Sequence, residues 1–161
     1  MLAKKAKSYN FDSVKDIDSK FIEFQEKVMG KKPYTILIHA HWCGHCVALL
    51  PVWKKMILNL NDPGVTIVTL EHSVFNHLQN AHSEHGLAKL FSDKVNGFPY
   101  IANVETNSSV SEFNEDRSQK LLETFIAKQK KNVSMIKTKS TTKPTSKPTT
   151  KPTRKVLKKL K

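Results

Sequence analysis

Cysteine is scarce in this chain of 161 residues, and only Cys43 and Cys46 occur. A structural disulfide stabilises a fold mainly by closing a long loop in the unfolded chain. The loop between these two cysteines is too short to have that effect. We therefore expect the pair to carry chemistry.

Long apolar runs are also missing. No stretch reaches the roughly 18 apolar residues of a membrane-spanning helix, so the sequence excludes a transmembrane segment. Residues 1–18 hold lysines with no apolar stretch behind them, and as written they form no secretory signal. The ending is not KDEL-like. We expect a non-secretory, cytoplasmic protein. A second expected location, where disulfides could form outside the secretory pathway, is the assembly zone or the virion of a large DNA virus.

Acidic residues are absent from the C-terminal part of the chain. Residues 130–161 hold 12 of the 27 Lys and Arg and no Asp or Glu, which leaves 15 bases against 14 acids in residues 1–129. The net charge of +13 therefore describes a tail, and the body is near neutral. Residues 141–155 repeat a Thr/Ser-Lys-Pro unit without side chains that could form a core, so we expect residues 130–161 to be a disordered basic tail.

Three roles for this basic tail stay open. It can serve as a solubilising extension. It can contact nucleic acid or another polyanion, with steep salt dependence, and its lack of aromatic residues makes such contact non-specific. Its ending KVLKKLK, with Val156, Leu157 and Leu160 on one face, is a candidate membrane-surface or targeting element.

Apolar spacing predicts an alternation of helices and strands before the tail. In chain order we expect a helix over 13–30, a buried strand over 31–41, a helix from Cys43 to about residue 60, a strand over 65–72, helix over 74–92, two short strands over 98–105 and 108–114, and a closing helix over 116–131. The strand–helix–strand unit implies a parallel pair with a right-handed crossover, and the last two strands imply an antiparallel hairpin.

The stretch WCGHC, residues 42–46, lies where the first strand runs into a helix. Cys43 opens that helix, where the helix dipole and free N–H groups favour the thiolate that attacks disulfides. Cys46 follows one turn later on the same side and can resolve a mixed disulfide. His45 between them favours the Cys43 thiolate and makes the pair more oxidising.

These residues resemble a known family. WCGHC, followed by Leu49 and Pro51, resembles the active site of the thioredoxin superfamily, and its CGHC form resembles protein disulfide isomerase. Gly97-Phe98-Pro99 resembles the family's Gly-aromatic-Pro element, whose cis proline lies against the cysteines beside a substrate-binding backbone. Arg117, four residues after Phe113 at the opening of the last expected helix, resembles the arginine that acts on the inner cysteine.

The resemblance implies an α/β thioredoxin fold, a central mixed β-sheet flanked by helices, over residues 12–129, with residues 1–11 as an N-terminal extension. It implies disulfide exchange with protein thiols and disulfides by a monomer that needs no cofactor beyond the Cys43–Cys46 disulfide. The site residues expected are Cys43, Cys46, His45 and Arg117 for catalysis and Trp42, Gly44, Phe98 and Pro99 for substrate binding.

One departure from the family affects the mechanism. The family has a buried acid six residues before the first cysteine, where it relays the proton of the inner thiol, and this chain has Leu37 there. Leu37, His39 and His41 share one side of the strand because side chains alternate. We hypothesise that His39 or His41 takes over proton transfer, since imidazole titrates near neutrality. The alternative for His39 is a core side chain.

Two alternatives to a redox centre are a zinc site and a redox-inactive binding module. Zinc would need two histidines besides the cysteines. The candidate histidine ligands are His41, His45, His72, His77, His82 and His85. The last four keep no single helix face, so we expect no metal. The other alternative is a redox-inactive binding module, tethered by the basic tail to nucleic acid or another polyanion. Leu37, in place of the family's acid, is an argument for this module, and the intact cysteine pair is an argument against it.

Overall fold

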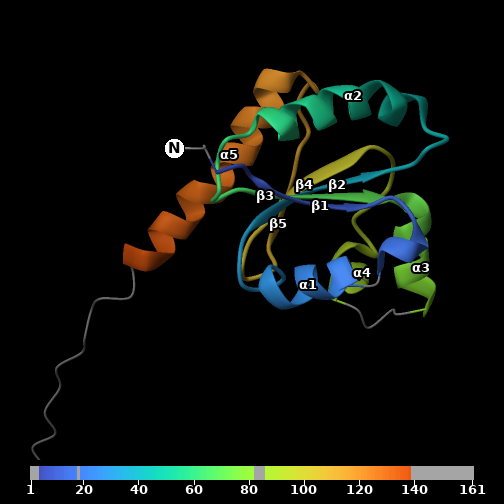
Figure 1. Cartoon of the computed structure of the whole chain (residues 1–161), viewed down its shortest axis with the longest axis horizontal. Coiled ribbons are helices and arrows are strands. Elements are labelled where there is room, and N and C mark those ends of the chain that lie inside the picture. The colour runs from blue at the N-terminus through green and yellow to red at the C-terminus, as the bar shows by residue number, and fades with distance from the viewer. Residues whose placement is uncertain (1–3, 18, 82–85, 139–161) are drawn as a thin grey trace, which may run out of the picture.

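Two fully buried strands rich in β-branched residues lie inside a five-stranded sheet. The computed structural model describes residues 4–17, 19–81 and 86–138. In it β2 (Tyr34–His39) and β3 (Thr66–Glu71) are buried at every position. Helices cover both faces of the sheet (Figure 1), so both sides of these strands are buried, including their polar side chains, which are Thr35, His39, Thr66, Thr69 and Glu71.

The strand order is β1-β3-β2-β4-β5. β1 (Lys7–Phe11) and β2 both run parallel to β3, while β4 (Tyr100–Val104) is antiparallel to β2 and to β5 (Val110–Glu112). The prediction of a mixed sheet with a parallel pair and a C-terminal hairpin is confirmed.

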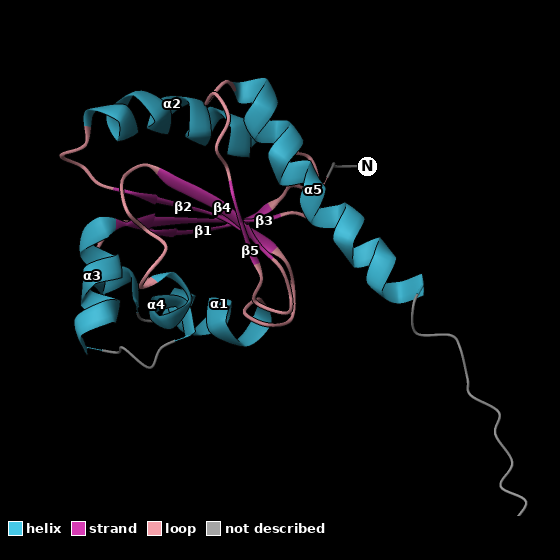
Figure 2. Ribbon diagram, turned by 180° about the vertical axis from the view of Figure 1, so that it is seen from behind, coloured by secondary structure: helices cyan, strands magenta, loops and turns pink. Residues whose placement is uncertain are grey.

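The helices form two layers, as Figure 2 shows from behind. α2 (Gly44–Asn59) and α5 (Gln119–Thr138) cover one face of the sheet. The other face carries α1 (Ser19–Lys27), α3 (His72–Ala81) and α4 (Gly86–Phe91), with a short 3-10 helix, η1 (Val14–Ile17), before α1. The predicted thioredoxin architecture is therefore confirmed.

Strand alternation divides the core between these layers. Ile36 and Ile38 pack into the apolar cluster on the α1, α3 and α4 side, and Leu37 packs into the cluster under α2 and α5. Trp53 of α2 is fully buried in that second cluster, and its indole N–H donates to the Thr69 hydroxyl at 3.0 Å. Trp53 is thus core, as predicted, and it fixes α2 to β3.

Three expected boundaries are wrong. Residues 7–11 are not an extension outside the domain but the edge strand β1, which buries Tyr9 and Phe11 against the sheet. The expected helix over 13–30 is divided into η1 and α1. The Asp16 carboxylate accepts the backbone N–H groups of Asp12 and Ser13 there, which favours a separate first turn.

The third boundary concerns the basic tail. α5 continues to Thr138, so residues 130–138 are helical and do not belong to a disordered tail. Each residue added to an existing helix gains one backbone hydrogen bond, and α5 extends in this way from its packed first half (Figure 1). Residues 139–161, with the Lys-Pro repeat and the KVLKKLK ending, lie outside the described residues.

Among the described residues, no helix has the length and apolar character needed to cross a bilayer.

Candidate active site

The carboxyl end of β2 delivers the first cysteine to the start of α2. Cys43 is the N-cap residue of α2, in extended backbone conformation, and its N–H donates to the Ala40 carbonyl at 3.1 Å. The backbone N–H of Cys46 donates to the Cys43 sulfur at 3.3 Å. Helix entry at Cys43 is therefore confirmed, and the helix offers an N–H group to stabilise negative charge on this sulfur.

Cys46 lies one turn further along and is completely buried. Burial, followed by the hydrogen bond with Cys43, raises the pKa of the Cys46 thiol to about 11, although the Ala40 backbone and Arg117 act in the opposite direction. Cys43 is only half-buried. The accessible sulfur can meet a substrate, and the buried one is held as a protonated thiol.

The loop before β4 closes the site from the other side. The Phe98–Pro99 peptide bond is cis, as the resemblance implies, and the Cys43 thiol donates to the Phe98 carbonyl at 3.5 Å. The Trp42 side chain is 72% exposed and lies edge-on to the Phe98 ring, with 5.8 Å between centroids. Pro99, Phe98 and Trp42 are thus gathered around Cys43.

A hollow of about 490 Å³ adjoins Cys43 on this side. We call it the Cys43 hollow. Trp42, His72 and Phe98 form its aromatic side, with the His72 ring 4.9 Å from that of Phe98. α3 adds the amides of Asn76 and Gln79. Apart from His72 and Cys43 itself, its lining carries no titratable group.

A smaller hollow of about 240 Å³ lies on the opposite flank, lined by His45, Ala48, Leu49, Val52 and Arg117. We call it the Arg117 hollow. Arg117 lies in the loop before α5 and its charge favours the Cys46 thiolate, as the Cys46 pKa indicates. The structure thus places Arg117 and His45, both predicted to act in catalysis, on this flank of the cysteine pair. Gly44 is exposed in the first turn of α2, with open space around its Cα.

His39 is almost fully buried at the end of β2, with 1% of its surface exposed. Its Nε2 atom lies 3.7 Å from an Asp12 carboxylate oxygen, and neither ring nitrogen has a hydrogen-bond partner among the described residues. Burial lowers the pKa of His39, which Asp12 opposes, so the ring is neutral near pH 7. His41 is exposed, with its ring 5.5 Å from that of His39.

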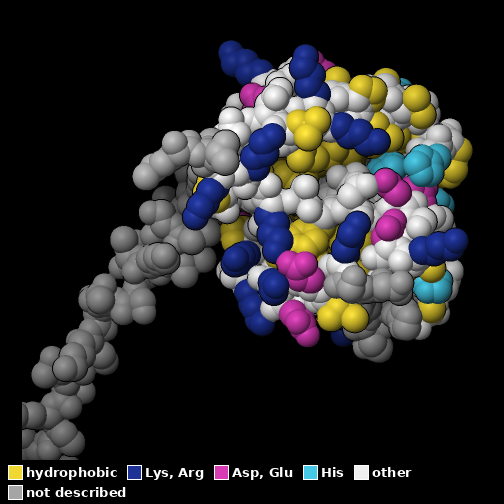
Figure 3. All heavy atoms as spheres, viewed as in Figure 1, with side chains coloured by type: hydrophobic (Ala, Val, Ile, Leu, Met, Phe, Trp, Pro, Cys, Tyr) yellow, Lys and Arg dark blue, Asp and Glu magenta, His cyan; other side chains and the backbone are white. Residues whose placement is uncertain are grey.

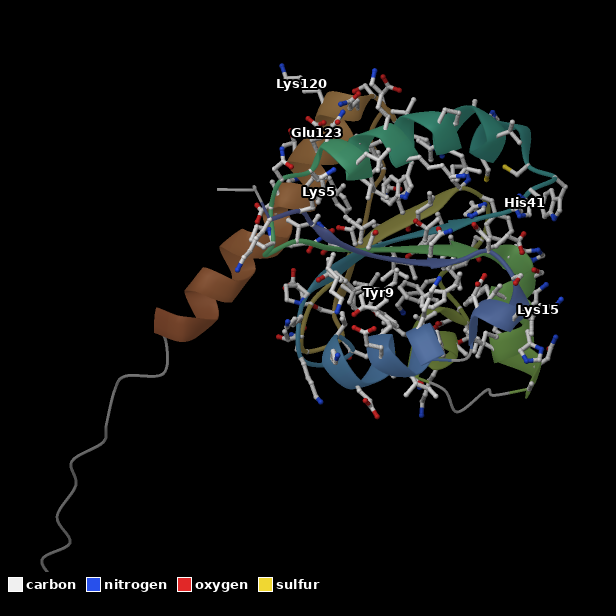
Figure 4. All side chains as sticks on the ribbon, viewed as in Figure 1. Lys5, Tyr9, Lys15, His41, Lys120 and Glu123 are labelled. Atoms are coloured by element: carbon white, nitrogen blue, oxygen red, sulfur yellow. The ribbon has the colours of Figure 1, made fainter. Side chains whose placement is uncertain are left out.

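The histidines and their acidic neighbours form one end of the molecule. Histidine and acidic side chains gather there on the surface (Figure 3), and Figure 4 shows His41 beside the loop that leads into α2. The charges that act on His39 come from Asp12, His41, Glu71 and Lys54. Those that act on Cys46 come from Cys43 and Arg117. His39 therefore lies in an electrostatic setting distinct from that of the buried thiol.

Glu71 is a site residue that the sequence did not point to. It ends β3 at 4% exposure and accepts the Ser73 backbone N–H at 2.5 Å, the Ser73 hydroxyl, and the His41 backbone N–H. Burial raises the pKa of Glu71, but these hydrogen bonds outweigh it and hold the pKa below its ordinary value. The sequence signal for this residue was a glutamate at the end of a buried strand, two residues before a serine that can donate hydrogen bonds to it.

The described residues contain no group of three or more His, Cys, Asp or Glu side chains that could hold a zinc ion. His72 lines the Cys43 hollow and His77 belongs to α3. His82 and His85 lie outside the described residues.

Comparison with known proteins agrees with this geometry. DnaJ homolog subfamily C member 16 of Homo sapiens is 36% identical over 72 residues, which cover 42% of this chain and 9% of that protein. Protein disulfide-isomerase erp38 of Neurospora crassa is 31% identical over 99 residues, covering 60% of this chain and 24% of that protein. The chain thus spans less than a third of either relative.

Among solved structures, the first two thioredoxin domains of Naumovozyma dairenensis Eps1p match with a TM-score of 0.51 and 16% identity, over 65% of this chain and 37% of that one. That likeness concerns the fold alone. The family model named Thioredoxin matches residues 16–128, which run from η1 to the middle of α5 and include both cysteines and Pro99. On this evidence the chain belongs to the thioredoxin family.

Proposed function

We propose that the chain exchanges disulfides with protein substrates, with Cys43 as the attacking sulfur and Cys46 as the resolving one. The observation that carries this proposal is the setting of the Cys43 sulfur, half-buried at the start of α2, where it accepts the Cys46 N–H and faces the Phe98 carbonyl. Membership of the thioredoxin family supports thiol–disulfide oxidoreductase chemistry at the level of the family.

The exchange takes place in two balanced steps. The Cys43 thiolate attacks one sulfur of a substrate disulfide, a Cys43–substrate bond forms, and the second substrate sulfur leaves as a thiolate that takes up a proton. Cys46 then loses its proton and attacks Cys43. The Cys43–Cys46 disulfide forms and the first substrate sulfur leaves, so the protein is oxidised and the substrate reduced. The reverse sequence oxidises a substrate dithiol without any added cofactor.

The surroundings of Cys43 suit a polypeptide substrate. The exposed Trp42 ring and the Phe98 ring offer apolar contact, and the backbone around Pro99 lies beside the reacting sulfur. Amide side chains of α3 in the Cys43 hollow can hydrogen-bond to an extended chain. These groups support protein thiols and disulfides as the substrate class.

An isomerase-like or oxidising direction is the finer part of the proposal. His45 lies between the cysteines and lines the Arg117 hollow, and a protonated imidazole there favours the Cys43 thiolate over the disulfide. A dithiol stabilised in this way gives a more oxidising disulfide. The name of the Neurospora relative, a protein disulfide-isomerase, agrees with this direction.

The test combines an activity and an equilibrium. The reduced protein is mixed with a protein whose disulfides have been scrambled, and recovery of the native pairing is followed; the variant with both Cys43→Ser and Cys46→Ser is the matched control. The reduction potential is then measured against glutathione. A value near about −180 mV supports the isomerase-like direction, and one near about −270 mV supports a reductase instead.

A rate equal to that of the double-serine variant would refute the exchange activity. Such a result would instead favour the redox-inactive binding module, for which the relatives give no support.

A further inference from the structure

The two hollows that flank the cysteine pair differ in charge. The Cys43 hollow is lined by aromatic and amide side chains, and its lining contains no Lys, Arg, Asp or Glu. The Arg117 hollow holds a guanidinium and an imidazole against an apolar wall of Ala48, Leu49 and Val52. Fixed positive charge beside the reacting sulfurs therefore lies on one flank.

Arg117 is available for a ligand. Within the described residues it forms no ion pair, although Glu115 and Asp116 directly precede it in the same exposed loop. A guanidinium carries five donors in a planar fork that matches a carboxylate, and His45 offers a further donor from the first turn of α2. Of the apolar neighbours Leu49 is buried, whereas Arg117 and His45 are exposed, so a ligand can reach both from solvent.

We infer that the Arg117 hollow binds a carboxylate of the substrate, carried close to the reacting cysteine. This inference rests on the proposed function and specifies its substrate class. The carboxylate belongs to an acidic side chain of a protein substrate or to a small acidic thiol such as glutathione, and the chemistry of the contact is the same for both.

Binding at this place affects the two steps of exchange in opposite ways. Attraction to Arg117 speeds capture of an acidic substrate by Cys43. The same carboxylate offsets the Arg117 charge that favours the Cys46 thiolate, so Cys46 deprotonates less readily and attacks Cys43 more slowly. An acidic substrate therefore forms the mixed disulfide faster and keeps it longer, which a simple gain in affinity would not produce.

The experiment uses the reduced full chain and two disulfide-linked peptides that differ by Glu against Gln beside the cysteines. Samples are quenched with acid over time, and the mixed disulfide is quantified by mass spectrometry. We expect capture to be about threefold faster with the Glu peptide, and its resolution slower by a similar factor, as for a partly exposed charge pair. Both differences disappear as salt is raised.

Arg117→Gln is the decisive variant, and its overall rate is also expected to fall because Cys46 loses a favourable charge. It should treat the Glu and Gln peptides alike in both steps. Lys120→Gln is the matched control, since it removes the same charge from an exposed residue at the start of α5 whose side chain points outward in Figure 4. That variant should keep the preference of the natural protein.

Glutathione disulfide identifies the source of the carboxylate. If Arg117→Gln slows its capture as much as that of the Glu peptide, small acidic thiols use the hollow; if only the Glu peptide is affected, protein side chains do. Equal kinetics of the two peptides with the natural protein, or a preference that survives Arg117→Gln, would overturn the inference while leaving the exchange activity intact. Absence of any mixed disulfide would overturn the proposed function as well.

Discussion

Cys43 and Cys46 are separated by a single helical turn and lie in opposite surroundings. Cys43 is accessible at the N-terminus of α2 and receives a backbone N–H, whereas Cys46 is completely buried with a thiol pKa of about 11. The CxxC motif alone does not show which of its two sulfurs attacks the substrate and which resolves the mixed disulfide. Their different roles follow from where β2 ends and α2 begins, because this junction leaves one sulfur outside and places the other in the core.

The largest expected effect separates these roles by removing the inner sulfur. Cys46→Ser keeps the Cys43 sulfur at the helix start, so attack on a substrate disulfide continues, but nothing resolves the product. We expect the mixed disulfide to accumulate to nearly one per protein, measured as a mass increase under non-reducing conditions. Cys43→Ser is the matched control and should show no adduct. An adduct on Cys46 in that control would contradict the assignment of roles.

The next effect is a dependence on pH. Since the pKa of Cys46 is raised to about 11, its thiolate is a small fraction at neutral pH. That fraction, and with it the resolving step, should rise about tenfold for each pH unit between about pH 7 and 9. Acid-quenched time courses of mixed-disulfide decay measure it. A decay rate independent of pH would show that a nearby base already removes the proton.

The sequence predicted most of the fold because the central elements carry strong patterns. β2 and β3 are short segments rich in β-branched residues, and α2 has apolar residues at helical spacing, so each was evident without tertiary information. β1 was missed because only Tyr9 and Phe11 face the core between polar neighbours, and its pairing with β3 is set by tertiary contacts. The end of α5 was missed since composition does not show how far a packed helix extends.

The candidate site was predictable where it depends on local sequence. Cys43 at a helix start and the Phe98–Pro99 bond opposite it followed from motifs. The environment of His39 could not be predicted from local sequence. Its neighbours Asp12 and Glu71 come from the loop after β1 and from β3, and they approach His39 only in the folded sheet. Strand periodicity gave the side of the sheet but not the partners.

Leu37 provides a direct way to change the surroundings of Cys46. It is fully buried under α2, at the position where the resemblance to the family implies a proton-relaying acid. In Leu37→Glu, burial raises the pKa of the new carboxyl toward neutrality, and it should accept the Cys46 proton. We expect resolution at pH 7 to be about tenfold faster, with a weaker pH dependence.

Leu37→Gln is the matched control for this variant. Both substitutions place a polar group in an apolar cluster and should lower the free energy of unfolding by about 3 kcal/mol. Only the carboxyl can take a proton, so only Leu37→Glu should accelerate resolution. Equal acceleration in both variants would mean that loosened packing, rather than proton transfer, exposes Cys46.

The smallest effect concerns the histidines beside the site, where His39→Phe is compared with His41→Phe. Phenylalanine fills a similar space at His39 and removes two buried ring nitrogens that have no hydrogen-bond partner among the described residues, so the free energy of unfolding should rise by about 1 kcal/mol. If His39 transfers protons, His39→Phe should also slow disulfide exchange by about threefold and remove an inflection below about pH 6.5, because burial lowers the pKa of this ring.

The two readouts together distinguish the interpretations of His39. Chemical denaturation measures stability, and exchange rates across pH measure proton transfer. A gain in stability with a loss of rate means that the buried imidazole is retained for chemistry at a cost to the fold. A gain in stability with an unchanged rate identifies His39 as a core side chain and contradicts its role in proton transfer. If only His41→Phe slows exchange, the exposed imidazole next to Trp42 carries the proton instead.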